Sequence, residues 1–375
     1  MSEIQTYDLL IIGGGLAGLC CALHLSMNGC KVLLIEKHKY PNHRVCGEYV
    51  SNEILPYLNT LDIHPMEVGA KRISKLEISM KNGNVLSSEL PLGGFGLSRY
   101  AFDELFYKIV KNKIDIIFDT VERVDFRGST FTVQTQEKSS FRADFVVGAF
   151  GKRSNIDTFM KRKFIKKTSP WLAVKAHYNY NFPNDTVALH NFEGGYCGLS
   201  KTETDAVNAC YLTSYESFKR FGNILSFQEN VLTENPHLKR FFKEAEPLFK
   251  SPLTISQISF ESKKPVENHI FMIGDSAGLI HPLCGNGMAM AIHSAKIFSE
   301  IFLKEFSGGE VNRDRMETEY TRQWRETFSR RLKNGRRIQS ILLRPVAASI
   351  GFSAVKRMPF LLNNLIRSTH GSVVI

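Results

Sequence analysis

The sequence predicts an α/β protein: a discontinuous domain built on a parallel sheet, an antiparallel-β domain inserted in it, and helices at the C-terminus. Apolar runs typical of buried parallel strands lie at residues 7–12, 31–35 and 269–275. Between the second and third runs, apolar and polar residues alternate, and Asn82-Gly83 indicates a hairpin turn. Parallel elements therefore bracket antiparallel ones, which favours one domain inserted in another.

The domain boundaries follow from this pattern. We place the first domain at residues 1–70, 96–160 and 262–305, the inserted domain at 71–95 and 161–261, and a basic helical region at 306–375. The chain has 375 residues, of which 43% are hydrophobic and 23% charged, and this is the composition of a globular protein with a sizeable core.

The composition also limits where the protein works. No apolar run reaches the roughly 18 residues that a membrane-spanning helix needs. The N-terminus lacks the basic start of a secretory signal. Seven cysteines without a CxxC pair favour a reducing compartment and argue against disulfides and a metal site. We therefore expect a cytoplasmic protein, either free or peripheral on the inner face of a membrane.

The net charge of +11 is unevenly distributed. After Glu326 the chain holds nine cations and no acidic residue, and residues 152–167 hold seven cations against Asp157 alone. These segments are either solvated basic surfaces or faces for an anionic partner, such as an anionic membrane surface or an acidic carrier protein. The sequence carries no recognisable nucleic-acid module, so we expect no nucleic-acid partner.

A glycine-rich turn follows the first strand. Gly13, Gly15 and Gly18 form the pattern G-x-G-x-x-G, and a helix begins at Leu16. This spacing suits a tight turn, the approach of a pyrophosphate to the backbone, and close packing of the helix on the strand. Glu36 ends the second strand, where a carboxylate accepts hydrogen bonds from ribose hydroxyls. These features predict a Rossmann-like dinucleotide site, without choosing between FAD and NAD.

A second glycine-rich segment makes that choice. The apolar strand ends at Gly274-Asp275, and a loop with Pro282 leads to Gly285-Asn286-Gly287 and a long helix. Paired with the first turn, this segment resembles the FAD-dependent oxidoreductases of the para-hydroxybenzoate hydroxylase fold, and it is most similar to the geranylgeranyl reductase family. The resemblance implies that FAD is the cofactor, that Asp275 accepts from its ribityl chain, and that the helix N-terminus faces its isoalloxazine ring.

Further residues carry over with the resemblance. The helix SRYAFDELF is similar to the R-x-x-F/L-D-x-x-L helix of the family, which implies that Arg99 contacts the cofactor. Arg44, in the loop after Glu36, is a candidate for the cofactor phosphates. The residues predicted to bind the cofactor are Gly13, Gly15, Leu16, Ala17, Gly18, Glu36, Lys37, Arg44, Arg99, Gly274, Asp275, Gly285, Asn286, Gly287 and Met288.

Two segments depart from the family pattern. Phe150 replaces the aspartate of the usual G-A-D-G segment, which the hydroxylase branch uses for flavin and nicotinamide nucleotide. NAD(P)H is therefore only a candidate electron donor. Either the enzyme uses a different donor, or Lys152 and Arg153 bind the phosphates of the nicotinamide nucleotide. Gly195-Tyr196 matches the G-Y-x-W-x-F-P strand of geranylgeranyl reductases, but the Trp and Phe-Pro are missing. The substrate contacts of the family therefore do not transfer to this chain.

Cys46 and Glu48 are the candidate catalytic residues. The segment VCGE resembles the Cys-Gly pair of geranylgeranyl reductases, in which the cysteine faces the substrate side, and Glu48 stands where a second glycine is common. Cys46 is either a proton donor, a substrate-positioning group or a packing residue. His281 and His293 flank the second glycine-rich segment and are either general acids or packing residues.

The predicted function is that of an FAD-dependent oxidoreductase. The resemblance implies an enzyme that reduces C=C bonds of a hydrophobic isoprenoid, polyene or acyl substrate by hydride transfer from flavin. The first alternative is an FAD-dependent aromatic monooxygenase that uses NAD(P)H and O2. A second alternative, from another class, is a membrane-surface flavin-binding scaffold protein.

Overall fold

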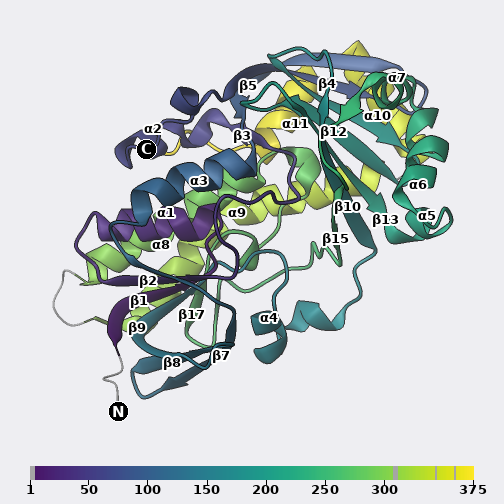
Figure 1. Ribbon diagram of the computed structural model, residues 1–375. Helices are drawn as coiled ribbons and strands as arrows, with labels where there is room; N and C mark the ends of the chain where they lie inside the picture. The colour runs from purple at the N-terminus through teal and green to yellow at the C-terminus, as the bar shows by residue number, and fades with distance from the viewer. Residues whose placement is uncertain (1–4, 307–310, 343, 359) are drawn as a thin grey trace.

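The computed structural model of the chain describes residues 5–306, 311–342, 344–358 and 360–375 (Figure 1). Two sheets form its frame. The first sheet has the strand order β16-β17-β9-β1-β2-β6, and the hairpin β7–β8 joins it through β9. Its strands are β1 (Thr6–Ile12), β2 (Val32–Glu36), β6 (Asp115–Phe118), β7 (Val121–Arg127), β8 (Thr130–Thr135), β9 (Ser140–Gly148), β16 (Val266–Glu267) and β17 (Ile270–Met272).

The central strands of this sheet are parallel and buried. β1 pairs with β2 in the register Leu10–Leu33 and with β9 in the register Leu10–Val146. β17, about 120 residues further on, pairs with β9 in the same direction, so the sheet is assembled from segments far apart in the chain. Helices α1 (Leu16–Ser26), α3 (Arg99–Val110) and α8 (Gly287–Phe306) cover one face of the sheet (Figure 1).

The second sheet is antiparallel except for one parallel pair, β4 with β11. Its order is β14-β10-β13-β12-β11-β4-β5-β3, and β15 pairs with β10. Its strands are β3 (Tyr49–Ser51), β4 (Lys71–Ser79), β5 (Val85–Gly96), β10 (Trp171–Asn179), β11 (Thr186–Phe192), β12 (Gly195–Lys201), β13 (Val207–Ser214), β14 (Glu246–Pro247) and β15 (Leu253–Ser256). β3 comes from the segment assigned to the first domain and pairs with β5.

Short helices cover one face of this second sheet. They are α5 (Tyr215–Lys219), α6 (Ile224–Asn230) and α7 (Pro236–Glu244). Phe227 of α6 and Phe241 of α7 are buried against strand residues such as Val174 and Tyr211. Each of these helices begins at a Ser or Asn side chain that accepts a backbone N–H, as is usual at an N-cap. The opposite face of the sheet remains for the cavity described below.

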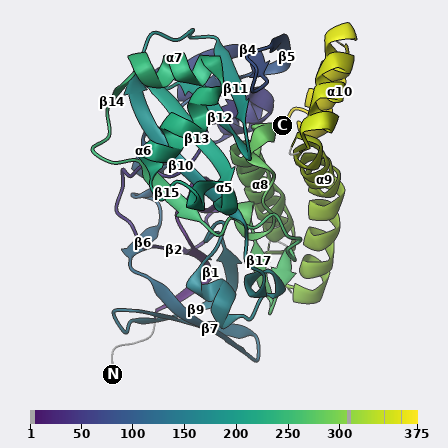
Figure 2. The same ribbon diagram turned by 90° about the vertical axis from the view of Figure 1, so that its right-hand side faces the viewer.

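The C-terminal helices pack on the rest of the protein. They are α9 (Arg313–Leu342), α10 (Pro345–Arg357) and α11 (Phe360–Thr369), and Figure 2 shows α9 and α10 along one side of the molecule. Tyr320 of α9 donates to the carbonyl of Met272 in β17 (2.6 Å). Leu362 and Ile366 of α11 are buried against the second sheet. Helix α11 therefore packs on the protein's own body through these two side chains.

No single helix in the described ranges is long and apolar enough to cross a membrane. By length and composition together, α9 and residues 346–357 pass that test as a pair, and the two are bent by 108°.

Candidate functional site

A cavity of about 1290 Å³ lies between the two sheets and extends to the C-terminal helices. It is larger than the roughly 300–1,000 Å³ of an ordinary ligand pocket. Of the fifteen residues predicted to bind the cofactor, all but Gly18 and Asn286 line it. Cys46 and Glu48 line it as well. The fold therefore brings together the two glycine-rich segments and the VCGE loop around one space.

The first glycine-rich turn has no room for side chains. Gly13 has a φ of +105°, and a Cβ there would lie 2.5 Å from the carbonyl oxygen of Ala149. A Cβ on Gly18 would lie 2.0 Å from the carbonyl oxygen of Gly13, so Gly18 packs α1 against the turn instead of facing the cavity. Because α1 begins at Leu16, its unpaired N–H groups and positive dipole end meet the cavity, as a pyrophosphate requires.

Glu36 lies under this turn in a nearly buried position. Its carboxylate accepts from the backbone N–H of Gly14 (2.6 Å) and of His38 (3.0 Å). Each carboxylate oxygen can accept two hydrogen bonds, so Glu36 keeps capacity for ribose hydroxyls. The glycine-rich turn and Glu36, which belong to the same motif in the sequence, therefore lie next to each other in the structure.

Arg44 and Arg99 share one buried acid. Arg99 makes a bidentate pair with Asp103 (2.7 Å for both bonds), and Arg44 Nε donates to the same carboxylate (3.2 Å). Arg44 Nη2 lies 3.4 Å from Glu36 but has no hydrogen-bond partner, although it is buried. A buried guanidinium nitrogen without an acceptor, at the edge of a pyrophosphate turn, is the donor that a phosphate oxygen would satisfy. The residues at this end of the cavity therefore fit FAD.

The second glycine-rich segment is held in place by buried cations that belong to neither glycine-rich motif. Lys263 donates to the carbonyl of Asp275 (2.7 Å), and burial lowers the pKa of Lys263 to about 8. Arg162 is almost fully buried; it pairs with Asp157 (2.8 Å) and donates to the carbonyl of Ser276 (2.9 Å). These contacts fix the loop that carries Asp275, whose segment lines the cavity.

Asn286 faces away from the cavity and joins the C-terminus to this segment. Its side chain donates to Glu53 (3.3 Å) and to the carbonyl of Thr369 (3.1 Å). Glu53, which is fully buried, also accepts from Arg331 Nη1 (2.9 Å) and from the backbone N–H of Gly371 (2.7 Å). We call Glu53, Arg331 and Asn286 the C-terminal latch, because they tie α9 and the residues after α11 to the second glycine-rich segment.

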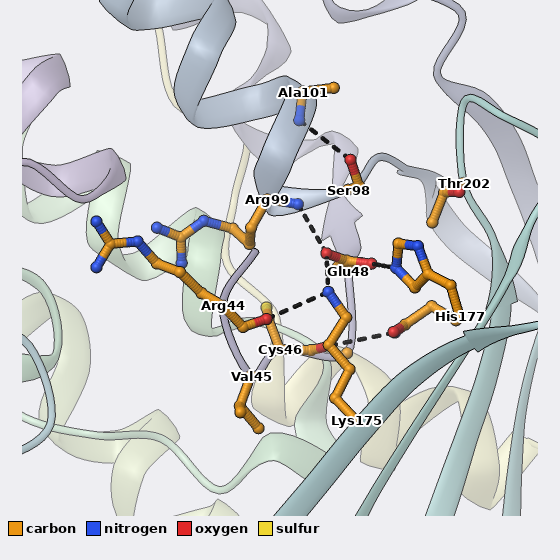
Figure 3. A network of polar contacts seen from close by, with 12 residues as sticks. Arg44, Val45, Cys46, Glu48, Ser98, Arg99, Ala101, Lys175, His177 and Thr202 are labelled. Carbon is orange, nitrogen blue, oxygen red and sulfur yellow. Dashed lines mark hydrogen bonds and ion pairs between the residues drawn. The ribbon is translucent and has the colours of Figure 1, made fainter. Parts of the chain in front are cut away.

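Glu48 lies in a buried ion-pair cluster (Figure 3). Glu48 and Lys175 of β10 are both 0% exposed and form a short ion pair. His177 Nε2 donates to the other carboxylate oxygen (2.7 Å), and the backbone N–H of Arg99 donates to Glu48 Oε1 (2.8 Å). Burial on its own would raise the pKa of Glu48, but Lys175 and His177 outweigh it and hold this pKa below the ordinary value. The carboxylate is therefore ionised, with both oxygens engaged.

Two polar residues inside an otherwise apolar strand are the signal for this cluster. In WLAVKAHYN, Lys175 and His177 lie two positions apart and therefore on one face of β10. With His43, Glu48 and His177 are also close enough for their ligand atoms to meet at a cation. Lys175 already neutralises the carboxylate there, which disfavours a second positive charge.

The same strands hold the backbone of the VCGE loop. Lys175 donates to the carbonyl of Arg44 (3.2 Å), Asn208 to that of Cys46 (3.2 Å) and Ser200 to that of Gly47 (3.4 Å). Glu48 has a φ of +57°, a conformation that a side chain other than glycine adopts only where its surroundings impose it. The loop is thus fixed by the second sheet. Cys46 is partly buried on the cavity wall.

The far end of the cavity is apolar. Strands β4, β5 and β11 face helices α9, α10 and α11 across it. Of the described lining residues at this end, only Thr369 and His370 are polar and none is an acid, lysine or arginine. The apolar ones include Leu76, Ile78, Leu86, Leu90, Val187, Leu189, Ile338, Phe352, Val355, Leu362 and Ile366. This end has the chemistry of a site for a hydrocarbon chain.

His281 and His293 lie outside the described cavity lining. His281 is packed among the rings of Trp171, Tyr196 and Phe260, and His293 packs edge-on against Phe328. Burial lowers the pKa of His281 to about 3 and that of His293 to about 4. Both rings are therefore neutral at pH 7, and their positions favour the packing alternative.

His281 makes the stability of the protein depend on pH. In the unfolded chain a histidine takes up a proton near pH 6.5, whereas the buried ring does not, so the free energy of unfolding falls as the pH drops below about 6.5. His281→Asn keeps an acceptor for the Leu283 N–H but does not titrate. We expect the loss of unfolding free energy between pH 7 and 5 to shrink by about 2 kcal/mol in this variant, as measured by urea unfolding. The partly exposed His64→Asn is the control; an equal pH dependence of His281→Asn and the parent would contradict the prediction.

Gly18→Ala tests the dinucleotide turn. Because the added Cβ overlaps the Gly13 carbonyl, α1 has to shift away from the turn, and we expect FAD to bind about 10- to 100-fold more weakly. The flavin retained after gel filtration, relative to protein, measures this. Gly351→Ala adds a methyl group that meets nothing within 4 Å and should retain FAD fully. Undiminished FAD in Gly18→Ala would contradict the assignment of this turn.

Comparisons with known proteins agree with this geometry. Residues 8–47 match the profile of the family described as FAD dependent oxidoreductase. A digeranylgeranylglycerophospholipid reductase of Methanococcus aeolicus is 25% identical over 395 residues, covering 95% of this chain and 96% of the relative. Its counterpart from Methanosarcina acetivorans is 25% identical, with 86% and 81% covered.

Solved structures share the fold at lower identity. The flavin-dependent brominase Bmp2 has a TM-score of 0.78 and 18% identity, covering 97% of this chain and 93% of its own. A geranylgeranyl bacteriochlorophyll reductase-like protein from Thermoplasma acidophilum has a TM-score of 0.74 and 19% identity, with 91% and 89% covered.

The fold and the cavity thus define an FAD-dependent oxidoreductase. Among such enzymes, the chain is similar to digeranylgeranylglycerophospholipid reductases over most of its own length and of theirs. The predicted fold class, the predicted enzyme class and the resemblance stated from the motifs are confirmed.

Proposed function

We propose that the protein reduces carbon–carbon double bonds in a long hydrophobic chain of isoprenoid, polyene or acyl type. The observation that carries this proposal is the continuity of the cavity. One space runs from the glycine-rich turns that fit FAD to an end whose described lining is apolar. The names of the relatives from Methanococcus aeolicus and Methanosarcina acetivorans support an isoprenoid lipid as the first substrate to try.

In this proposal one end of the cavity binds the cofactor and the other end binds the substrate. When bound, FAD supplies the hydride chemistry. The turn at Gly13–Gly18 and the Arg44 Nη2, which makes no hydrogen bond of its own, would hold its phosphates, and Glu36 its ribose. Gly285 and Gly287 line the cavity at the N-terminus of α8, so the positive end of this helix would stabilise negative charge beside it. The apolar end would exclude water and align the chain.

We propose Cys46 as the proton donor and Glu48 as a positioning residue. Saturating a double bond takes one hydride and one proton, and the proton requires a donor close to the substrate. Cys46 lines the cavity together with Arg99 of α3 and with Tyr196 and Cys210 of the second sheet. The ionised Glu48 has no proton to give, but it holds the loop that presents Cys46.

The experiment follows flavin reoxidation first without oxygen and then, in a parallel sample, with it. The purified holoprotein is reduced chemically and mixed with a geranylgeranyl lipid, a polyene or an unsaturated acyl lipid. We expect reoxidation with one of these substrates and a product two hydrogens heavier per double bond by mass spectrometry. Reoxidation that requires O2 and yields a hydroxylated product would instead establish the monooxygenase alternative. Failure to reoxidise with any lipid or with O2 would overturn both.

Cys46→Ala separates chemistry from cofactor binding. Removal of a general acid typically costs about 10²- to 10⁴-fold in rate, so we expect lipid-driven reoxidation to slow by that factor while FAD content stays unchanged. Cys210→Ala, a second cysteine on the same cavity wall, is the matched control and should keep most of the rate. Full turnover in Cys46→Ala would make this residue a packing residue.

NAD(P)H remains the proposed electron donor to test first. Lys152 and Arg153 line the cavity beside Phe150, which stands in place of the usual aspartate. Lys152 already donates to the carbonyl of Val45 (3.3 Å), whereas Arg153 is exposed. If this region receives nucleotide phosphates, Arg153→Glu should raise the NAD(P)H concentration needed for flavin reduction and leave chemical reduction unchanged.

A further inference from the structure

Large apolar side chains are exposed together on the C-terminal helices. Val346 and Ile350 of α10 are 74% and 66% exposed, which is unusual for side chains of this kind on a helix that covers a soluble domain. We call the exposed apolar residues of these helices the C-terminal apolar surface. Its members are Ile341, Val346, Ile350, Met358, Phe360 and Leu365.

Helix α10 carries apolar side chains on two opposite faces. Ala348, Phe352 and Val355, spaced by four and three positions, line the cavity. By helical spacing Val346 and Ile350 lie on the opposite face and are exposed, and Figure 2 shows α10 at the outer edge of the molecule. The outer face of α10 also carries the exposed Ser349, Ser353 and Arg357, so Val346 and Ile350 form an apolar strip that is covered only if a second apolar medium contacts this face.

The charged residues that the C-terminal helices themselves contribute at this surface have one sign. Arg344, Lys356, Arg357 and Arg367 are all exposed, and the chain holds no acidic residue after Glu326. A second copy of the chain on a two-fold axis would bring these cations against their own counterparts, which disfavours a dimer through this surface. A bilayer of anionic phospholipid supplies both things that the surface lacks, negative charge and hydrocarbon.

The surface also meets the cavity. Ile341 and Leu365 line the apolar end and are exposed at the same time. A lipid hydrocarbon chain that leaves a bilayer at this position would therefore pass from the bilayer to apolar side chains of the cavity with little contact with water.

We propose that the C-terminal apolar surface docks on an anionic phospholipid bilayer and delivers a lipid-borne chain into the apolar end of the cavity. Delivery rests on the proposed function, whereas docking does not. The outer face of α10 would enter the headgroup region, and the surrounding cations would pair with lipid phosphates. An acidic carrier protein would use the cations but leave the apolar residues without a partner.

Flotation of the purified holoprotein with liposomes tests docking without any assay of turnover. We expect binding to vesicles of phosphatidylcholine with phosphatidylglycerol, weak binding to phosphatidylcholine alone, and release as salt rises from about 0.05 to 0.5 M. Val346→Glu/Ile350→Glu should weaken binding by about tenfold or more. Lys356→Glu/Arg357→Glu should weaken it by at least about 25-fold, since each cation near an anionic surface contributes about fivefold.

Matched variants on two other helices, α6 and α7, are the controls. Leu225→Glu replaces an apolar residue that is 70% exposed on α6, and Lys239→Glu/Lys243→Glu reverses two exposed charges on α7. Both should float like the parent. Equal binding by the α10 variants, or no binding to anionic vesicles at low salt, would overturn the proposal. Conversion of a dimer to a monomer by Val346→Glu/Ile350→Glu, with lipid binding intact, would overturn it in favour of a second copy. Flotation with no lipid-driven flavin reoxidation would overturn the proposed function and leave docking standing.

Discussion

Lys175→Met is expected to destabilise the protein by about 3–5 kcal/mol, because it leaves the buried Glu48 without its charge partner. Methionine retains most of the volume of lysine, so loss of packing contributes little to this change. Urea unfolding at pH 7 measures the free energy. The effect extends to the site, since Lys175 also holds the carbonyl of Arg44, and we expect weaker FAD retention in the folded fraction.

The double variant Lys175→Met/Glu48→Gln distinguishes an unpaired charge from a lost contact. Without the carboxylate, no buried charge remains uncompensated, and most of the lost stability should return. Lys167→Met breaks a pair with Glu261 whose two side chains are largely exposed, so it should change the unfolding midpoint little. A loss below about 1 kcal/mol in Lys175→Met would show that the pair contributes no more than a surface ion pair.

The pH dependence of the Glu48 contribution has a defined sign. Since its folded pKa lies below the ordinary carboxyl value, the stabilisation is present at neutral pH and is lost as the pH falls through that lowered pKa. The parent and Lys175→Met should therefore converge in stability only in acid.

Arg331→Met is expected to have an effect of similar size through the C-terminal latch. Arg331 is nearly buried against the fully buried Glu53, so its removal leaves another uncompensated carboxylate, at a cost of about 3–5 kcal/mol. The loss of stability should also affect neighbouring segments, because Glu53 accepts hydrogen bonds from the Gly371 N–H and from Asn286 of the second glycine-rich segment. We expect faster proteolysis within residues 360–375 and weaker flavin binding, read from cleavage sites and from flavin content.

Arg367→Met provides the matched control for the latch, since Arg367 is an exposed cation on the neighbouring α11. It should leave both proteolysis and flavin content unchanged. Arg331→Met/Glu53→Gln should restore stability in part. If Arg331→Met behaved like Arg367→Met, the C-terminal helices would be independent of the flavin end of the cavity.

The local motifs were predictable because their physics is local. A glycine with positive φ, a helix N-terminus and an acid at a strand end form a phosphate and ribose site within about 25 residues, so spacing alone reveals them. The apolar strand before Gly274-Asp275 and the helix from Gly287 follow the same rule. The role of Asn286 was harder to predict, since it belongs to a cofactor motif but lies outside the cavity lining, whereas the packing role of Gly18 follows from the motif's spacing.

The sequence by itself determined the two glycine-rich turns, the order of parallel and antiparallel elements, and the cysteine beside them. Only the tertiary structure decided which buried charges meet. Glu48 pairs with Lys175, which is 127 positions away in the sequence, and Glu53 pairs with Arg331, which is 278 positions away. The tertiary structure also decided that the basic C-terminal helices close the apolar end of the cavity. The physical reason is that burial makes such pairs obligatory without specifying the partner: a buried carboxylate requires a cation, but periodicity and spacing say nothing of which strand or helix will bring it.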